Sequence, residues 1–131
     1  MLQFGMPTLI ENHTLEDNIH LCQNLGLKFI ELNMNFPKYQ LKNLADTKKI
    51  FDLASKAGIY YTIHLDENVY IYGFNLFVSK AYLRTIKKTI SIAKKLLPLQ
   101  NRFGNQSMPF VINMHMNHGV YMTLPKENIY V

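Results

Sequence analysis

The fold is decided by the stretch Lys28-Phe-Ile-Glu-Leu-Asn-Met34, in which side chains of different character alternate. Successive side chains of a β-strand point to opposite faces, so a strand here has two unlike faces. One face carries Phe29, Glu31 and Asn33, and the other carries Ile30, Leu32 and Met34. We therefore expect a strand that buries its second face in a core and presents polar groups on its first face.

Two later stretches show the same alternation. Residues 59–65 contain His64, and residues 110–116 contain His115, each on the face opposite its apolar neighbours and near the C-terminal end of the predicted strand. The C-terminal ends of parallel strands meet at one end of a sheet, which is where α/β barrels keep their active sites. We therefore expect Glu31, His64 and His115 to converge in one polar cup.

Helical patterns separate the predicted strands. Thr14 stands as an N-cap ahead of apolar residues at helical spacing, while Gly26 and Gly58 are placed to end helices and Pro98 to end a third. The three predicted helices cover residues 15–25, 44–57 and 77–97. The predicted buried stripe of the third helix is Val78, Tyr82, Ile86, Ile90, Ala93 and Leu97. A polar linker over residues 100–109 then leads to the last strand.

With a first strand over residues 2–8, the elements alternate strand and helix, which predicts a parallel α/β sheet made of right-handed βαβ units. An open sheet that binds a dinucleotide needs a glycine-rich turn after its first strand, yet residues 7–14 contain no glycine. The polar face of the strands instead favours a barrel. The sequence therefore predicts a single domain over residues 1–131 that forms a parallel (β/α) half-barrel, with the first four strands and three helices of a TIM barrel.

Composition and charge exclude several classes of protein. A chain of 131 residues with 48% hydrophobic and 18% charged residues is typical of one globular domain. No apolar run approaches the roughly 18 residues of a membrane span, so a cytoplasmic protein is expected. The net charge of +5 permits phosphate binding, but Lys87, Lys88, Lys94 and Lys95 fall on one solvated helix face without interleaved aromatic residues, so nucleic-acid binding is not expected. Cys22 is predicted to be a buried hydrophobe.

The strand ends resemble those of the xylose isomerase-like superfamily, which includes sugar and sugar-phosphate isomerases and epimerases and the endonuclease IV enzymes. The resemblance rests on Phe29-Ile-Glu-Leu-Asn33, on the histidine in Thr62-Ile-His-Leu-Asp66 and on Val111-Ile-Asn-Met-His115. Metal-dependent members place one histidine at the end of the third strand and another at the end of the fourth. His118 and Gly119 are similar to the glycine-containing turn that follows, although Met116 stands where the family often has proline.

The resemblance implies a metal-dependent sugar or sugar-phosphate isomerase or epimerase, with His64 and His115 as ligands of zinc or manganese and Glu31 as the catalytic carboxylate. The alternative is a non-catalytic half-barrel module, in which the two histidines would be internal hydrogen-bonding groups. A complete barrel has about 250 residues, so we expect a half that self-associates or pairs with a separate C-terminal half. Because further carboxylate ligands would come from that second half, the isolated chain is expected to bind metal weakly or not at all.

Overall fold

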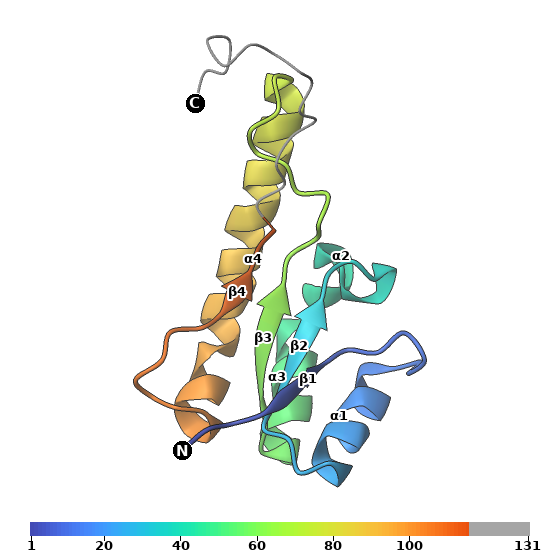
Figure 1. Cartoon of the computed structure of the whole chain (residues 1–131), viewed down its shortest axis with the longest axis vertical. Helices are drawn as coiled ribbons and strands as arrows, with labels where there is room; N and C mark the ends of the chain where they lie inside the picture. Colours follow the sequence, from blue (N-terminus) through green and yellow to red (C-terminus); the bar gives the residue numbers. More distant parts are fainter. Residues whose placement is uncertain (116–131) are drawn as a thin grey trace.

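The structure is a computed structural model, which describes residues 1–115 of the chain (Figure 1). His118, Gly119 and the rest of residues 116–131 lie outside the described residues. The described residues form an α/β fold with a four-stranded sheet, all of whose strands are parallel. This confirms the α/β class and the parallel sheet that the sequence predicts.

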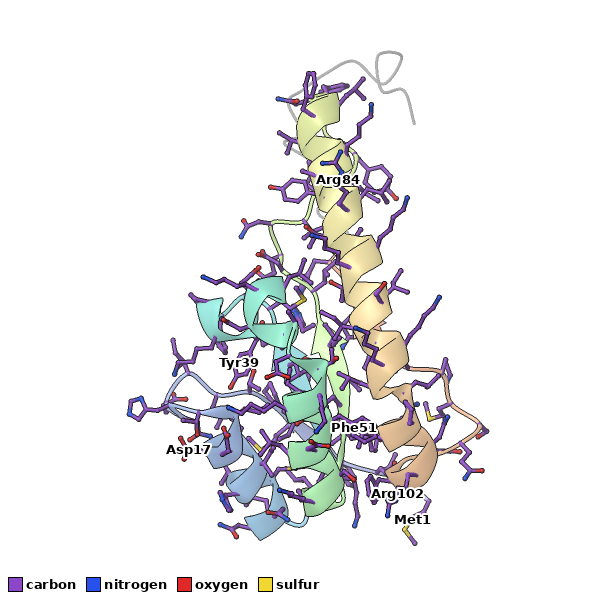
Figure 2. All side chains as sticks on the ribbon, turned by 180° about the vertical axis from the view of Figure 1, so that it is seen from behind. Met1, Asp17, Tyr39, Phe51, Arg84 and Arg102 are labelled. Atoms are coloured by element: carbon purple, nitrogen blue, oxygen red, sulfur yellow. The ribbon has the colours of Figure 1, made fainter. Side chains whose placement is uncertain are left out.

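The strands follow one another across the sheet in chain order, β1-β2-β3-β4. They are β1 (Gly5–Pro7), β2 (Phe29–Asn33), β3 (Tyr60–His64) and β4 (Ile112–Asn113). The helices are α1 (Leu15–Asn24), α2 (Leu41–Leu44), α3 (Thr47–Ala57) and α4 (Leu76–Phe103), with a short 3₁₀ helix over Pro37–Tyr39. Seen from the front and from behind, the helices cover one face of the sheet (Figures 1 and 2). Within the described residues every helix therefore lies on the same face of the sheet, and the other face has no helix on it.

Helix α1 begins where the sequence predicts it. The Thr14 hydroxyl accepts a hydrogen bond from the Asp17 backbone N–H at 3.0 Å, and the Asp17 carboxylate accepts one from the Thr14 N–H at 2.9 Å. This reciprocal pair is a capping box, which satisfies two N–H groups that the first helical turn leaves without partners. Hydrogen bonds that the Asp17 carboxylate accepts from the side chain and the backbone of Thr14 lower the pKa of the Asp17 carboxyl. After the helix, Gly26 has a φ of 67°, which favours glycine.

Helix α3 is shorter than the predicted helix over residues 44–57. It begins at Thr47 because Asp46 caps it, with the side chain accepting a hydrogen bond from the Lys49 N–H at 3.1 Å. Residues 41–44 form the separate helix α2. The predicted end is confirmed, since Gly58 adopts a left-handed conformation with φ 70° and its N–H bonds back to the last turn.

The core lies between the sheet and the helices. Ile30 and Leu32 of β2 and Met34 just after it are all fully buried there, whereas the opposite face of β2 is half-buried. Cys22 of α1 is also fully buried, as expected, and burial raises the pKa of its thiol. The alternation in residues 28–34 therefore identified the core-facing side correctly.

Helix α4 departs from the prediction in two ways. It continues through Pro98 to Phe103. Pro98 is exposed, so the Lys94 carbonyl that loses its partner can face water, while buried Leu99 packs in the core and buried Gln100 donates to the carbonyls of Met108 and Pro109. The predicted buried stripe is also wrong in part, since Val78 and Ile90 are exposed. The residues of α4 that are buried are Thr89, Ile92, Ala93, Leu96, Leu99 and Gln100.

The physical reason for the shifted stripe is length. The 28 residues of α4 extend about 42 Å at the helical rise, whereas the five residues of β3 extend about 17 Å. The N-terminal half of the helix therefore projects past the strands, as Figure 1 shows and as the position of Arg84 in Figure 2 indicates. Val78, in this half, therefore has no sheet beneath it to cover it. Ile90 lies in the other half and is exposed because it faces the side of the helix, about 100° round from buried Thr89.

Candidate metal site at the ends of β3 and β4

His64, the last residue of β3, is held in one orientation by the backbone. Its ring Nδ1 lies 3.0 Å from the Leu65 carbonyl oxygen. A carbonyl oxygen only accepts hydrogen bonds, so Nδ1 is the donor in this contact, and in the tautomer with the proton on Nδ1 the lone pair is on Nε2. A histidine that binds metal is usually oriented by such a contact through its other nitrogen. His64 is thus prepared to offer Nε2 to a ligand.

His115 lies directly opposite that nitrogen. Strand β4 pairs with β3 so that His64 is the partner of Asn113, and the Leu65 N–H bonds to the Asn113 carbonyl at 2.8 Å. Two residues further along the chain, His115 returns to the same side, and its Nε2 lies 3.0 Å from Nε2 of His64. The two rings are tilted by 53° with centroids 4.9 Å apart. The structure therefore brings together the two predicted histidines from separate strands.

A third group, Glu67, joins the pair and was not among the predicted site residues. Its carboxylate oxygen Oε1 lies 3.7 Å from Nε2 of His115. The loop after β3 positions Glu67, since its N–H donates to the Asn35 side chain at 2.8 Å, and the adjacent Asp66 accepts a hydrogen bond from Gln40 at 2.9 Å. The sequence signal that could have found it is a carboxylate three residues after a strand-end histidine.

The geometry of these three side chains suits a small divalent cation. One ligand atom each from His64, Glu67 and His115 lie within 4.8 Å of one another. Ligand atoms about 2.05 Å from zinc in a tetrahedron are roughly 3.3 Å apart, close to the 3.0 Å between the two imidazole nitrogens and shorter than the 3.7 Å from Glu67 to His115, so the carboxylate would have to move closer to bind the same ion. Two imidazoles and one carboxylate are also a known catalytic zinc set that leaves a fourth position open. The donor set therefore fits zinc, and with more oxygen ligands it would fit manganese.

The site is open to water. The side chains of His115 and Glu67 are 50% and 56% exposed, so neither loses much hydration on folding. Exposure weakens electrostatic attraction between the ligands and a cation, because water screens the charges. A cation bound here would therefore exchange readily.

Glu31, the predicted catalytic carboxylate, lies on the same face but has a different partner. Strand pairing sets Glu31 beside Thr62, and Asn113 donates a side-chain hydrogen bond to the Glu31 carboxylate. Glu31 is not one of the three residues whose ligand atoms cluster. Asn113 is the β4 partner of His64 in the strand register, so its hydrogen bond orients Glu31 toward the cup without making Glu31 one of the clustered ligands.

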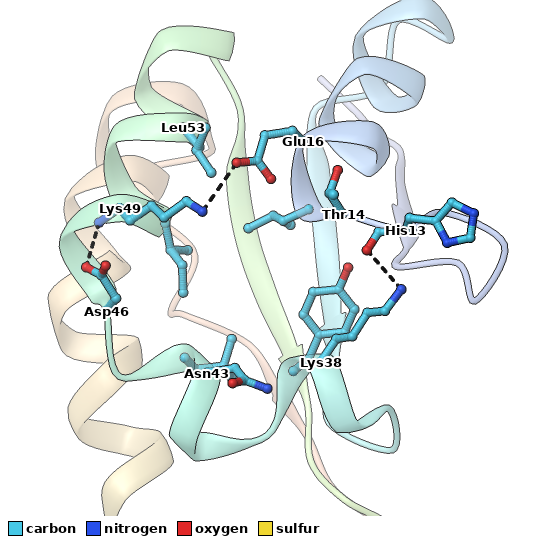
Figure 3. Close-up of a pocket in the computed structure, with 12 residues that line it drawn as sticks. His13, Thr14, Glu16, Lys38, Asn43, Asp46, Lys49 and Leu53 are labelled. Atoms are coloured by element: carbon cyan, nitrogen blue, oxygen red, sulfur yellow. Dashed lines mark hydrogen bonds and ion pairs between the residues drawn. The ribbon is translucent and has the colours of Figure 1, made fainter.

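Apart from this cluster, a cavity of about 310 Å³ lies among α1, α2 and α3 on the helical side of the sheet (Figure 3). Its charged groups already serve the fold. Lys49 pairs with Glu16 at 3.5 Å, Asp46 caps α3, and Lys38 donates to the backbone carbonyl of His13 at 2.9 Å. Each of these charged groups therefore already has a hydrogen-bond or ion-pair partner within the protein.

Comparisons of the chain with models of known protein families, with curated proteins and with solved structures gave no match. The superfamily resemblance accordingly rests on the strand-end residues alone. Among the helices of residues 1–115, none combines the length and the apolar character needed to cross a membrane.

Proposed function

We propose that this chain is one half of a metal-dependent sugar or sugar-phosphate isomerase or epimerase, built as the first four strands of a xylose isomerase-like TIM barrel. Two features support the barrel. The strands follow one another in chain order, and the described helices cover one face of the sheet, as a barrel requires of each of its segments. The other face carries the polar strand ends.

The observation that carries the proposal is the 3.0 Å separation of the His64 and His115 Nε2 atoms, with the Glu67 carboxylate beside them. These three side chains would hold a divalent cation at the C-terminal end of the sheet. When bound, such an ion polarises a carbonyl or hydroxyl oxygen of a sugar. The contact of His64 Nδ1 with the Leu65 carbonyl would leave Nε2 as the ligand nitrogen.

Glu31 is proposed to move the proton. A carboxylate on the cup face can accept a proton from a sugar carbon or hydroxyl and return it to the neighbouring atom. Asn113 donates a hydrogen bond to this carboxylate and so orients it on that face. The remaining ligands and substrate contacts would come from a second copy of the chain or from a separate C-terminal half.

A second candidate function is a non-catalytic half-barrel module. It is supported by the same histidine pair, because with His64 protonated on Nδ1 the ring of His115 can donate from Nε2 to Nε2 of His64. Both rings then have hydrogen-bond partners without any cation. In this case the cup would be a structural network that orients the loops after β3 and β4.

Nuclear magnetic resonance of the histidine side chains separates the two candidates. Zinc added to the full chain should change the ¹⁵N shifts of Nε2 of both His64 and His115, while exposed His20 is unaffected. The variant Glu31→Gln should bind zinc as the native chain does, because Glu31 is not a ligand. If zinc leaves both Nε2 signals unchanged, the module is the correct description. Tightly bound stoichiometric zinc after dialysis, together with isomerase turnover by the chain alone, would contradict the half-site.

A further inference from the structure

One flank of α4 carries an apolar row that the described residues leave uncovered. Residues seven apart lie almost in line on a helix, and Leu76, Leu83, Ile90 and Leu97 are spaced in this way. Leu76, Leu83 and Ile90 are 67%, 43% and 41% exposed. Leu97, nearer the sheet, is half-buried. We call these four residues the α4 flank row.

The flank row does not face the rest of the helical layer. Helix α4 buries Thr89, Ala93 and Leu96 on one side. It turns Lys88, Ser91, Ile92 and Lys95 to the other side, where they line a hollow shared with α2 and the start of α3. At 100° per residue, the flank row lies on the side of α4 away from α2 and α3. It therefore lies toward the β4 edge of the sheet that residues 1–115 form.

Basic residues accompany the row. Lys80, Lys87 and Lys94 are all exposed, and each follows a flank-row residue by four positions, so they form a parallel line one helical turn away. Every charged residue of α4 is basic. An apolar line beside a line of lysines is complementary to an amphipathic helix whose apolar positions are bordered by carboxylates.

We propose that the α4 flank row is a docking surface for an acidic amphipathic helix of a separate polypeptide. The helix would pack its leucine-type positions between Leu83 and Ile90 and place glutamates or aspartates against Lys80, Lys87 and Lys94. Burial of the row removes exposed apolar surface from water, and the charge pairs select the partner.

Charge is the reason that the occupant is a different polypeptide. In a twofold pair of antiparallel α4 helices, the lysine line of one copy would face the same line of the other, and like charges at such positions destabilise the pair. Residues 116–131 of this chain contain one lysine and one glutamate, so they supply no net negative charge. Neither a second copy of α4 nor residues 116–131 would therefore complement the charge of the lysine line as an acidic helix does.

The test uses two synthetic three-heptad peptides with identical leucine positions, one with glutamate and one with lysine at every flanking position. Fluorescence anisotropy with the full chain should show the glutamate peptide binding at least about tenfold more tightly than the lysine peptide. The variant Leu83→Asp/Ile90→Asp should weaken binding of the glutamate peptide by about tenfold or more. Phe77→Asp, which changes an 89% exposed apolar residue outside the row, should leave the affinity unchanged.

Charge reversal provides the second arm. Lys80→Glu/Lys87→Glu should exchange the preference, so that the lysine peptide binds more tightly, and circular dichroism should show the fold retained in every variant. Three results would overturn the proposal: equal binding of both peptides by the native chain, a dimer in sedimentation that Leu83→Asp/Ile90→Asp abolishes, or attachment to phosphatidylserine vesicles that depends on the flank row without any preference for the acidic peptide.

Discussion

Replacement of His64 by alanine is the sharpest test of the metal site. The native chain offers three partly exposed ligands, short of the four of a closed structural site. Structural four-ligand sites bind zinc with a free energy of about 10–16 kcal/mol. Because one ligand fewer is present here, we expect a binding free energy of about 7 kcal/mol, which corresponds to a dissociation constant near 10 µM. Loss of partners outside the ligand shell already costs 10–100-fold in affinity, so loss of a ligand should cost at least about 100-fold.

The consequence for stability follows from mass action. At 100 µM zinc and a dissociation constant of about 10 µM, binding to the folded state adds about 1.4 kcal/mol to the free energy of unfolding. For a domain of this size that is roughly 5 °C in the melting temperature. With the constant of His64→Ala at about 1 mM or more, the gain is below about 0.1 kcal/mol and the shift disappears.

Differential scanning fluorimetry with and without 100 µM zinc measures the shift, and a competitive titration against a coloured chelator measures the dissociation constant directly. The matched control is His20→Ala, which removes an exposed histidine of α1 outside the cluster. His64 is not a zinc ligand if His64→Ala keeps the zinc-induced shift in melting temperature, or if His20→Ala loses that shift to the same extent.

Three further outcomes are expected from the fold. Asp17→Asn should lower the free energy of unfolding at neutral pH, because hydrogen bonds from Thr14 lower the pKa of Asp17 in the folded state. Urea unfolding should show this difference from the native chain closing as the pH falls below about 4. Tyr61→Phe removes a hydroxyl that donates to the Ile50 carbonyl at 3.1 Å and should cost about 1 kcal/mol at neutral pH. Burial raises the pKa of Tyr61, so the native chain should lose stability above about pH 10, and Tyr61→Phe should lose less over the same range. Gly58→Ala should cost about 1 kcal/mol from the left-handed backbone alone, because a Cβ there meets no atom within 4 Å, whereas a cost near zero would show that the loop relaxes.

The predictions that held depend on local chemistry. Thr14 and Asp17 are three residues apart and cap α1 through their own hydrogen bonds, and Gly58 ends α3 because its backbone conformation favours glycine. Alternation in residues 28–34 identified the buried face, since strand geometry sends successive side chains to opposite sides. The convergence of His64 and His115 on one face follows from the same rule applied to parallel strands.

What the sequence could not determine depends on distances between segments. Glu67 reaches His115 only because Asn35 and Gln40, far earlier in the chain, hold the loop after β3. The Glu31 carboxylate meets Asn113, which is 82 positions away, through the order of the strands. No local pattern specifies such contacts, because loop conformation depends on the groups that receive its hydrogen bonds.

Helix α4 shows the division most clearly. By itself, the sequence determined that residues 77–97 are helical, with apolar positions at helical spacing, since propensity and periodicity act along the chain. Only the tertiary structure decided which of these positions are buried, because burial depends on how far the sheet extends beneath the helix. The tertiary structure also decided that the helix continues past Pro98. Buried Leu99 and Gln100 hold the turns that a proline would otherwise end, and the Lys94 carbonyl that Pro98 leaves unpaired can be hydrated at the surface.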